Sequence, residues 1–243
     1  MSSTSSIEPG DSLRTNERYP TWDNVIPLPP QSLLWSVGGS SLELFLLVGD
    51  AWMQAMAPYI QAGTSVLDIG CGCGRSARTL LPNTNVTRYV GFDVIPENID
   101  WCRRFIEPLS GGRACFLHYD IYSSEYRPQG TLHAVDLRFP CDDGSVDLII
   151  AASLFTHLLE LDAAHYLREI GRVISARGHA LLSIHTDTVA GEQYAGTETR
   201  IDVAPGYFAK LASEANLTLE RQTDLCGQTL LVFSPRTIKN RIL

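Results

Sequence analysis

The stretch Val66-Leu-Asp-Ile-Gly-Cys-Gly-Cys-Gly-Arg75 decides the fold of this 243-residue chain. Its first four residues predict a short, fully buried strand. Gly70, Gly72 and Gly74 follow at alternate positions, and a helix is predicted over residues 75–81. Glycines spaced in this way let the backbone turn tightly and approach a ligand that a Cβ would repel. The stretch therefore predicts a strand, a ligand-binding turn and a helix.

A second strand, Tyr89-Val-Gly-Phe-Asp-Val94, follows about one βαβ unit later and ends in a carboxylate. Asp93 at its tip can accept hydrogen bonds from both hydroxyls of a ribose. Asp68 would repel an anionic pyrophosphate, whereas it suits a cationic amino acid group. The dinucleotide fingerprint also needs glycine where this chain has Arg75. We therefore predict a nucleoside cofactor other than NAD, and a tight turn without a ligand is the alternative.

These residues resemble the first motif of class I S-adenosylmethionine-dependent methyltransferases, E/D-x-G-x-G-x-G, and Asp93 matches that family's ribose-binding acid. Phe139-Pro-Cys-Asp-Asp-Gly-Ser-Val-Asp-Leu-Ile149 is similar to the family's run into the fourth strand. Arg172-Val-Ile-Ser-Ala-Arg-Gly-His-Ala-Leu181 is similar to its lead into the fifth, with Ala176 and His179 replacing the usual proline and glycine. The departure concerns turn chemistry only. The resemblance covers roughly residues 40–235 and implies S-adenosylmethionine as the cofactor.

The resemblance also implies which residues hold the cofactor, all of them at strand ends or in the glycine turn. The methionine end would contact Asp68, Gly70, Cys71, Gly72 and Gly74, with Ser153 and Leu154 beneath the sulfonium, and the nucleoside would contact Asp93, Val94, Asp120 and Ile121. Asp136 is the alternative to Asp120, because Asp-x-x-Phe-Pro also resembles the family pattern. Asp120 is preferred, since residues 114–119 form the better predicted strand.

Two histidines are candidates for a general base, because imidazole titrates near neutrality. His157 comes directly after the fourth strand, in Leu154-Phe-Thr-His-Leu158. His185 ends the fifth strand, and Asp187 two residues later would face the same side. A structural role, at a helix start for His157 and at a strand end for His185, is the alternative for each.

The acceptor is expected to be a small molecule, a natural product or a sugar. The net charge of −8 disfavours a nucleic-acid substrate. The Asn/Asp-Pro-Pro-Tyr motif of adenine and amide methyltransferases is absent after the fourth strand, and Pro140-Cys141 is a poor match to the motif of base C5 methyltransferases. The histidines favour oxygen over nitrogen or carbon, and metal-independence is favoured because no sharp ligand cluster appears.

Two other functions stay open, because a fold does not decide a function. The same fold could use bound S-adenosylmethionine for non-methyl chemistry such as cyclisation. A non-catalytic cofactor-binding partner is ranked last, since neither the glycine turn nor the ribose acid is degenerate. A homodimer also stays open.

The substrate pocket is expected between an N-terminal segment and a long loop. The loop Tyr122–Val135 is longer than a minimal methyltransferase needs, and it is either a substrate wall or an inert insertion. Aromatic residues that could line the pocket, or simply fill the core, are Trp35, Trp52, Tyr59, Tyr122, Tyr126 and Tyr194.

The predicted organisation is a disordered tail over residues 1–20, a cap or lid segment over 21–62 and a methyltransferase domain over 63–243. The sequence predicts seven strands that alternate mostly with helices, near residues 65–69, 88–93, 113–119, 146–152, 179–185, 217–223 and 228–234. This pattern predicts an α/β fold: a seven-stranded, mostly parallel, doubly wound Rossmann-like sheet with an antiparallel last strand. No apolar stretch approaches the ~20 residues of a membrane span. Six cysteines without a C-x-x-C pair fit a reducing cytoplasm.

Overall fold

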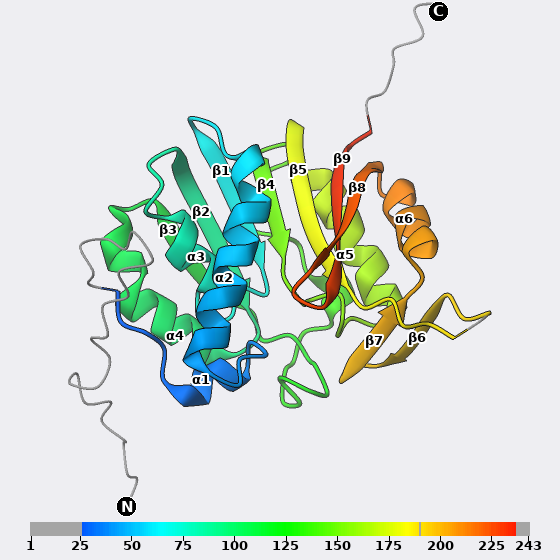
Figure 1. Ribbon diagram of the computed structural model, residues 1–243, viewed down its shortest axis with the longest axis horizontal. Helices are drawn as coiled ribbons and strands as arrows, with labels where there is room; N and C mark the ends of the chain where they lie inside the picture. The colour runs from blue at the N-terminus through cyan, green and yellow to red at the C-terminus, as the bar shows by residue number, and fades with distance from the viewer. Residues whose placement is uncertain (1–25, 190, 237–243) are drawn as a thin grey trace, which may run out of the picture.

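A computed structural model describes residues 26–189 and 191–236 of the chain. The predicted tail and residues 21–25 of the predicted lid lie outside these ranges. The predicted seven-stranded sheet is confirmed, with strand order β3-β2-β1-β4-β5-β9-β8 (Figure 1). Its strands are β1 (Thr64–Ile69), β2 (Val86–Asp93), β3 (Ala114–His118), β4 (Val146–Ala151), β5 (Ile174–Ile184), β8 (Leu217–Leu225) and β9 (Gln228–Pro235).

The first five strands run parallel, and β9 is antiparallel to both of its neighbours, β5 and β8. The antiparallel last strand is therefore confirmed. It lies inside the sheet, and β8 forms the edge. A short turn at Cys226-Gly227 joins the two strands, and both residues have positive φ angles, 52° and 78°. Such angles suit the tight turn of a hairpin.

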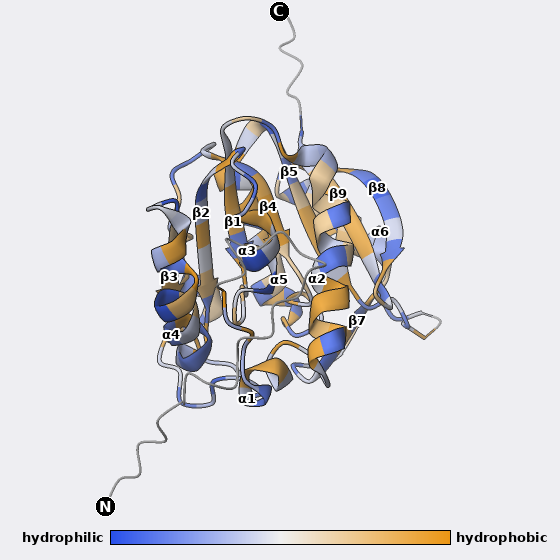
Figure 2. Ribbon diagram, turned by 60° about the vertical axis from the view of Figure 1, so that its left-hand side comes forward, coloured by the Kyte–Doolittle hydropathy of each residue, from blue (hydrophilic) through white to orange (hydrophobic). Residues whose placement is uncertain are grey.

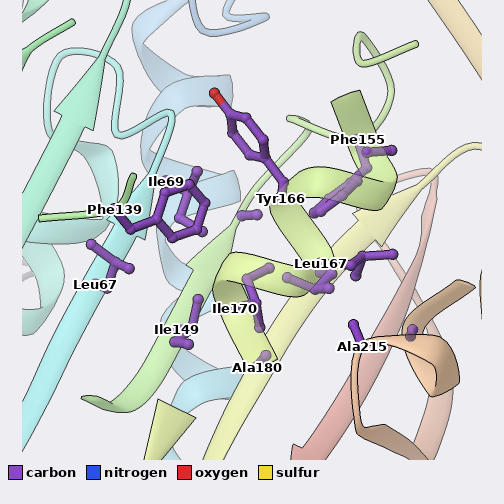
Figure 3. Packing of buried hydrophobic residues seen from close by; sticks show 14 of the residues in the cluster. Leu67, Ile69, Phe139, Ile149, Phe155, Tyr166, Leu167, Ile170, Ala180 and Ala215 are labelled. Atoms are coloured by element: carbon purple, nitrogen blue, oxygen red, sulfur yellow. The ribbon is translucent and has the colours of Figure 1, made fainter. Parts of the chain in front are cut away.

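Helices cover both faces of the sheet (Figures 1 and 2). They are α1 (Gln31–Trp35), α2 (Leu42–Met56), α3 (Arg75–Leu80), α4 (Pro96–Phe105), α5 (Glu160–Val173) and α6 (Pro205–Glu214). Residues of α2, α3 and α4 share one apolar core with the sheet, and residues of α5 and α6 share the other (Figure 3).

Strand β4 shows how one sequence serves both cores. Leu148 and Ile150 belong to the core beneath α2 to α4, whereas Ile149 and Ala151 belong to the core beneath α5 and α6. Successive side chains of a strand point to opposite faces, so the stretch of a strand that is covered on both sides is apolar, here residues 148–151. Burying each leucine or isoleucine contributes roughly 1.5–3 kcal/mol.

Two parts of the architecture differ from the sequence-based expectation. β5 begins at Ile174 instead of residue 179, because its pairing with β4 continues across an irregular register between Val146 and Leu148. A separate hairpin of β6 (Tyr194–Thr197) and β7 (Arg200–Val203), which was not predicted, precedes α6. The hairpin lies at the same end of the sheet as α1 (Figure 1).

The strand order reverses between β1 and β4. From β1 the chain proceeds outward to β2 and β3, and from β4 it proceeds to β5 on the other side. In open α/β sheets such a reversal leaves a crevice at the carboxyl ends of the strands, where ligands bind. Over the described residues, none of the helices has the length and apolar character that crossing a membrane requires.

Candidate functional site

A cavity of about 370 Å³ opens at the carboxyl ends of the parallel strands. Its wall comes from the segment 35–38, the glycine turn after β1, the ends of β2, β4 and β5, the loop after β3, α5, the turn of the β6–β7 hairpin and the start of β9. This volume lies within the range of small-molecule sites.

The glycine turn has the conformation that its sequence predicts. Gly70, Gly72 and Gly74 have φ angles of +70°, +53° and +84°. A Cβ on Gly72 would lie 2.3 Å from a methyl carbon of Val37, so glycine at this position lets the segment before α2 pack against the turn. Nη1 of Arg75 donates to the carbonyl of Val37 at 3.0 Å. Gly70 and Gly72 line the cavity, whereas Gly74 faces Cys102 and lies outside its wall.

Asp93 lies at the tip of β2, 8% exposed, and its carboxylate is held by backbone donors. The N–H groups of Gly72 and Ile95 donate to it at 2.8 and 2.9 Å. Burial raises the pKa of this carboxyl despite these bonds. The acid is therefore fixed at the cavity wall and has lone pairs left for a ligand.

Asp68 is 1% exposed and accepts a hydrogen bond from the hydroxyl of Tyr89. Burial raises the pKa of Asp68 to about 6, against the opposing effect of the Tyr89 hydrogen bond. A buried carboxylate at the wall of a cavity is stabilised by a cation brought in by a ligand. An ammonium group next to Asp68 and a pair of hydroxyls next to Asp93 fit this donor and acceptor set, as S-adenosylmethionine would supply them.

Most of the other predicted cofactor residues lie on the same wall: Cys71, Val94, Ile121, Ser153 and Leu154. Asp120 does not. Its carboxylate accepts from Thr131 Oγ1 and Arg127 Nε, each at 2.9 Å, and the Thr131 hydrogen bond, followed by Arg127, lowers its pKa. The competing Asp136 is also outside the cavity lining. Ile121 thus lines the cavity, whereas the side chain of Asp120 bonds to residues of its own loop.

His157 lines the cavity, and both of its ring nitrogens have protein partners. Nδ1 lies 2.7 Å from the carbonyl oxygen of Glu198, and Nε2 lies 3.0 Å from the hydroxyl of Tyr126. A carbonyl can only accept, so Nδ1 carries the proton and Nε2 accepts from Tyr126. In this arrangement the lone pair of His157 is already occupied.

His185 lines the cavity from the end of β5 and is half-buried. Within the described residues its ring has no hydrogen-bond partner, and burial, followed by the charge of Arg200, lowers its pKa. Asp187, expected to face the same side, does not line the cavity, and its carboxylate accepts from Arg200 at 2.6 Å. The imidazole of His185 is therefore neutral at neutral pH and open to the cavity.

The unpredicted β6–β7 hairpin closes the site on this side. The carboxylate of Glu198 accepts from Ser123 Oγ at 2.8 Å and from the N–H of Ser124 at 2.6 Å. The hairpin is thereby joined to the loop after β3, while the Glu198 carbonyl holds His157. The alternation Arg200-Ile-Asp-Val203, with Ile201 and Val203 buried, is the sequence signal that could have revealed the hairpin.

Asp162 and Tyr166 also line the cavity and were not assigned to it from the sequence. Their spacing of four residues on a helix that follows β4 is the signal for a shared face. Among the described residues, no group of three or more histidine, cysteine, aspartate or glutamate side chains could hold a metal ion.

Comparisons with known proteins agree with this geometry. Residues 66–178 match the family model for a methyltransferase domain. A TehB-like SAM-dependent methyltransferase from Corynebacterium glutamicum superposes with a TM-score of 0.55 and 20% identity, over 84% of this chain and 92% of that one. A SAM-dependent methyltransferase from Aquifex aeolicus has a TM-score of 0.60 and 16% identity, over 86% of this chain and 100% of that one.

A third similar structure is the 1,6-didemethyltoxoflavin-N1-methyltransferase of Burkholderia thailandensis, solved with 1,6-didemethyltoxoflavin and S-adenosylhomocysteine bound. Its TM-score is 0.53 and its identity 19%, over 87% of this chain and 92% of that one. At such identities the superpositions establish the fold, and the family model matches the stretch that holds the glycine turn and Asp93. Residues 66–178 therefore form a methyltransferase domain, and the cavity at the ends of its strands fits S-adenosylmethionine as the cofactor.

Proposed function

We propose that this methyltransferase acts on a small-molecule acceptor, methylates an oxygen atom and needs no metal ion. The observation that carries the proposal is that one cavity joins two chemically different halves. One half contains Asp68 and Asp93 with the glycine turn, and the other contains His185, His157 and the residues around them. A cavity of about 370 Å³ suits small ligands, and its acceptor half holds a free imidazole.

The cofactor half would bind S-adenosylmethionine through the predicted residues that reach the cavity. S-adenosylmethionine supplies an electrophilic methyl group on a sulfonium. Asp68 would pair with an ammonium group, Asp93 would accept from ribose hydroxyls, and Val94 and Ile121 would contact the adenine. Ser153 and Leu154 line the same cavity and would lie beneath the sulfonium. Holding the reactants in line supplies several kcal/mol of the catalytic effect.

His185 is the proposed general base. Its ring is open to the cavity, and its lowered pKa keeps it neutral, so it can take a proton from an acceptor hydroxyl. His157 has the lesser claim, since Tyr126 already occupies its Nε2. We assign His157 a positioning role: it holds Tyr126, and through it the loop after β3, against the cavity.

The segment before β1 is proposed to act as a cap. Trp35, Val37 and Gly38 line the cavity, and Tyr122 and Tyr126 line it from the loop after β3. Both segments would therefore frame the acceptor and exclude water from it. The ligands of the Burkholderia enzyme support a small-molecule acceptor, although that enzyme is named as an N-methyltransferase. The choice of oxygen rests on the free His185.

The decisive experiment measures formation of S-adenosylhomocysteine by the purified protein. A panel of phenols and sugar alcohols is compared with amines of matched skeleton, with and without EDTA. Methylation of hydroxyl compounds that persists in EDTA is the expected result. Methylation confined to nitrogen contradicts the assignment of oxygen, and loss in EDTA contradicts metal-independence. Consumption of a substrate without S-adenosylhomocysteine would favour cyclisation or other non-methyl chemistry.

A further inference from the structure

Asp162 and Tyr166 place two polar groups side by side on the wall of the acceptor half. They lie one turn apart on α5, and both line the cavity. Tyr166 is 3% exposed, and its ring packs edge-to-face on Phe139 with ring centroids 5.1 Å apart. Figure 3 shows its hydroxyl pointing out of the apolar cluster. The ring is thus fixed by the core, and only its hydroxyl is presented to the cavity.

Neither polar group has a hydrogen-bond partner among residues 26–189 and 191–236. The neighbouring polar groups do have partners, since Tyr126 bonds to His157 and Glu198 bonds to Ser123 and Ser124. The Tyr166 hydroxyl and the Asp162 carboxylate therefore face the cavity with their hydrogen-bonding capacity unused by the protein. A ligand with a polar group at this wall would use both.

The charge of this half indicates what that molecule carries. Burial raises the pKa of the Asp162 carboxyl, and the nearby charge of Glu198 raises it further. Among the described residues of the cavity wall, the one lysine or arginine is Arg75, at the cofactor end, where it bonds to Val37. The carboxylates of Asp162 and Glu198 thus meet no protein cation across the cavity. A ligand that brings a positive charge would compensate them.

The subsite lies on the acceptor side of the cavity. Asp68 and Asp93, at the ends of β1 and β2, provide the acids for an amino acid group and a ribose. Asp162 instead follows β4, close enough to Glu198 of the β6–β7 hairpin for its pKa to respond to that charge. Tyr166 lines the same cavity as Asp162 and Asp93, and burial, followed by the charges of these two acids, raises its pKa.

We propose that Asp162 and Tyr166 form a recognition subsite for a protonated amine carried by the acceptor, with the carboxylate pairing with the ammonium group and the phenol oxygen accepting one of its hydrogens. This inference rests on the proposed function, because it names the class of acceptor. The acceptors it favours carry a hydroxyl for methylation and an amine separated from it by an apolar body. Acceptors with a carboxylate in place of the amine are disfavoured, since Asp162 and Glu198 would repel them.

The test uses three phenols of one shape: tyramine, 4-ethylphenol and 3-(4-hydroxyphenyl)propanoate. Their binding to the full-length protein saturated with S-adenosylhomocysteine is measured by calorimetry. We expect tyramine to bind at least tenfold more tightly than either analogue. In Asp162→Asn this preference should fall about tenfold or more, and Tyr166→Phe should reduce it less. Glu160→Gln is the matched control, because Glu160 lies on the same helix outside the cavity wall and bonds to Tyr207.

The affinities for S-adenosylhomocysteine and S-adenosylmethionine show whether the subsite binds the acceptor or a part of the cofactor. Both should be unchanged in Asp162→Asn. A fall in both would assign the subsite to the nucleoside, and a fall for S-adenosylmethionine alone would assign it to the sulfonium; either result overturns the proposal. Absence of tyramine binding at millimolar concentration, or an unchanged preference in Asp162→Asn, overturns it as well. Because binding is measured without turnover, these results are independent of whether oxygen methylation is found.

Discussion

The hydroxyl of Tyr126 lies 3.0 Å from Nε2 of His157, and the two rings meet edge-to-face at an interplanar angle of 87°. Burial raises the pKa of Tyr126 to about 12, so the phenol keeps its proton and donates a hydrogen bond to the imidazole. The carbonyl of Glu198 holds the other ring nitrogen. His157, a candidate base from the sequence, thus connects the loop after β3 to the β6–β7 hairpin through hydrogen bonds to Tyr126 and Glu198.

This relationship predicts that His157→Ala and Tyr126→Phe have the same effect. Each should raise KM more than it lowers kcat, because the loop after β3 loses its anchor while the base is untouched. The double variant should be little worse than either single variant, since both remove one interaction. Steady-state kinetics with the pH dependence of kcat/KM checks this. Loss of the acidic limb of the profile in His157→Ala alone would show that His157 is the base.

His185→Ala should lower turnover by about 10²-fold or more and leave cofactor affinity intact. The pKa of His185 is lowered, so the neutral base persists below pH 6.5 and activity should decline only at more acidic pH. That decline should be absent from the residual activity of His185→Ala. His185→Gln, which keeps the size and polarity of the side chain, is the control for folding and packing. A wild-type rate in both variants would show that positioning alone drives transfer.

Asp68→Asn should stabilise the ligand-free protein while weakening cofactor binding. The folded pKa of about 6 exceeds the ordinary value of 3.8, so the favourable contribution of this group is complete below pH 3.8 and is lost as the pH rises through 6. At pH 8 the buried charge costs about 3 kcal/mol, because each pKa unit corresponds to 1.36 kcal/mol. In urea unfolding, Asp68→Asn should therefore have a higher free energy of unfolding than the wild type at pH 8, and the same free energy of unfolding at pH 3.5. Equal gains at both pH values would contradict the prediction.

Asp93→Ala should weaken binding of S-adenosylmethionine by about tenfold to a hundredfold, corresponding to about 1.5–3 kcal/mol. The variant loses the acceptor for two hydroxyls and leaves the N–H groups of Gly72 and Ile95 without their partner. Asp93→Asn keeps one acceptor oxygen, so its affinity for S-adenosylmethionine should lie between those of the wild type and Asp93→Ala. Calorimetry gives the affinities, and circular dichroism confirms folding. An unchanged affinity in Asp93→Ala would refute the ribose assignment.

Gly72→Ala should displace the cap segment. A Cβ at this position would lie 2.3 Å from the Val37 side chain, and the left-handed backbone adds strain of about 1 kcal/mol. Val37→Ala removes the atom that clashes, so the double variant should recover part of the cofactor affinity lost in Gly72→Ala. Hydrogen exchange over residues 31–39 provides the second measurement. No recovery in the double variant would mean that backbone strain, and not the cap, causes the loss.

The fold could be predicted from the sequence because its strands are locally encoded. The run Val66–Ile69 is apolar except for Asp68, and the same holds for Val146–Ala151 and Asp147, so burial on both faces leaves few other conformations. The hairpin of β6 and β7 escaped prediction, since its strands are four residues each and one contains Gly196. Short strands with a glycine carry little periodic signal.

Site residues could be predicted where the backbone conformation requires a particular residue type. They were harder to predict where a role depends on which hydrogen bonds a side chain makes. Glycine positions and the acid at the tip of β2 follow from the turn and the sheet. The orientation of Asp120 depends on Arg127 and Thr131, which lie in its own loop. The relative merits of His157 and His185 depend on Tyr126 and on the carbonyl of Glu198, a residue 41 positions beyond His157. Contacts of that range are not visible in a single sequence.

The β6–β7 hairpin has an evolutionary consequence. It enters the chain between β5 and α6, and its turn reaches the acceptor half of the cavity through Glu198 while the glycine turn and Asp93 lie elsewhere in the chain. Replacement or lengthening of this one hairpin would change the wall of the acceptor half and leave the residues of the cofactor half unchanged. Exchange of residues 186–203 between relatives is therefore a direct route to new acceptors on an unchanged scaffold.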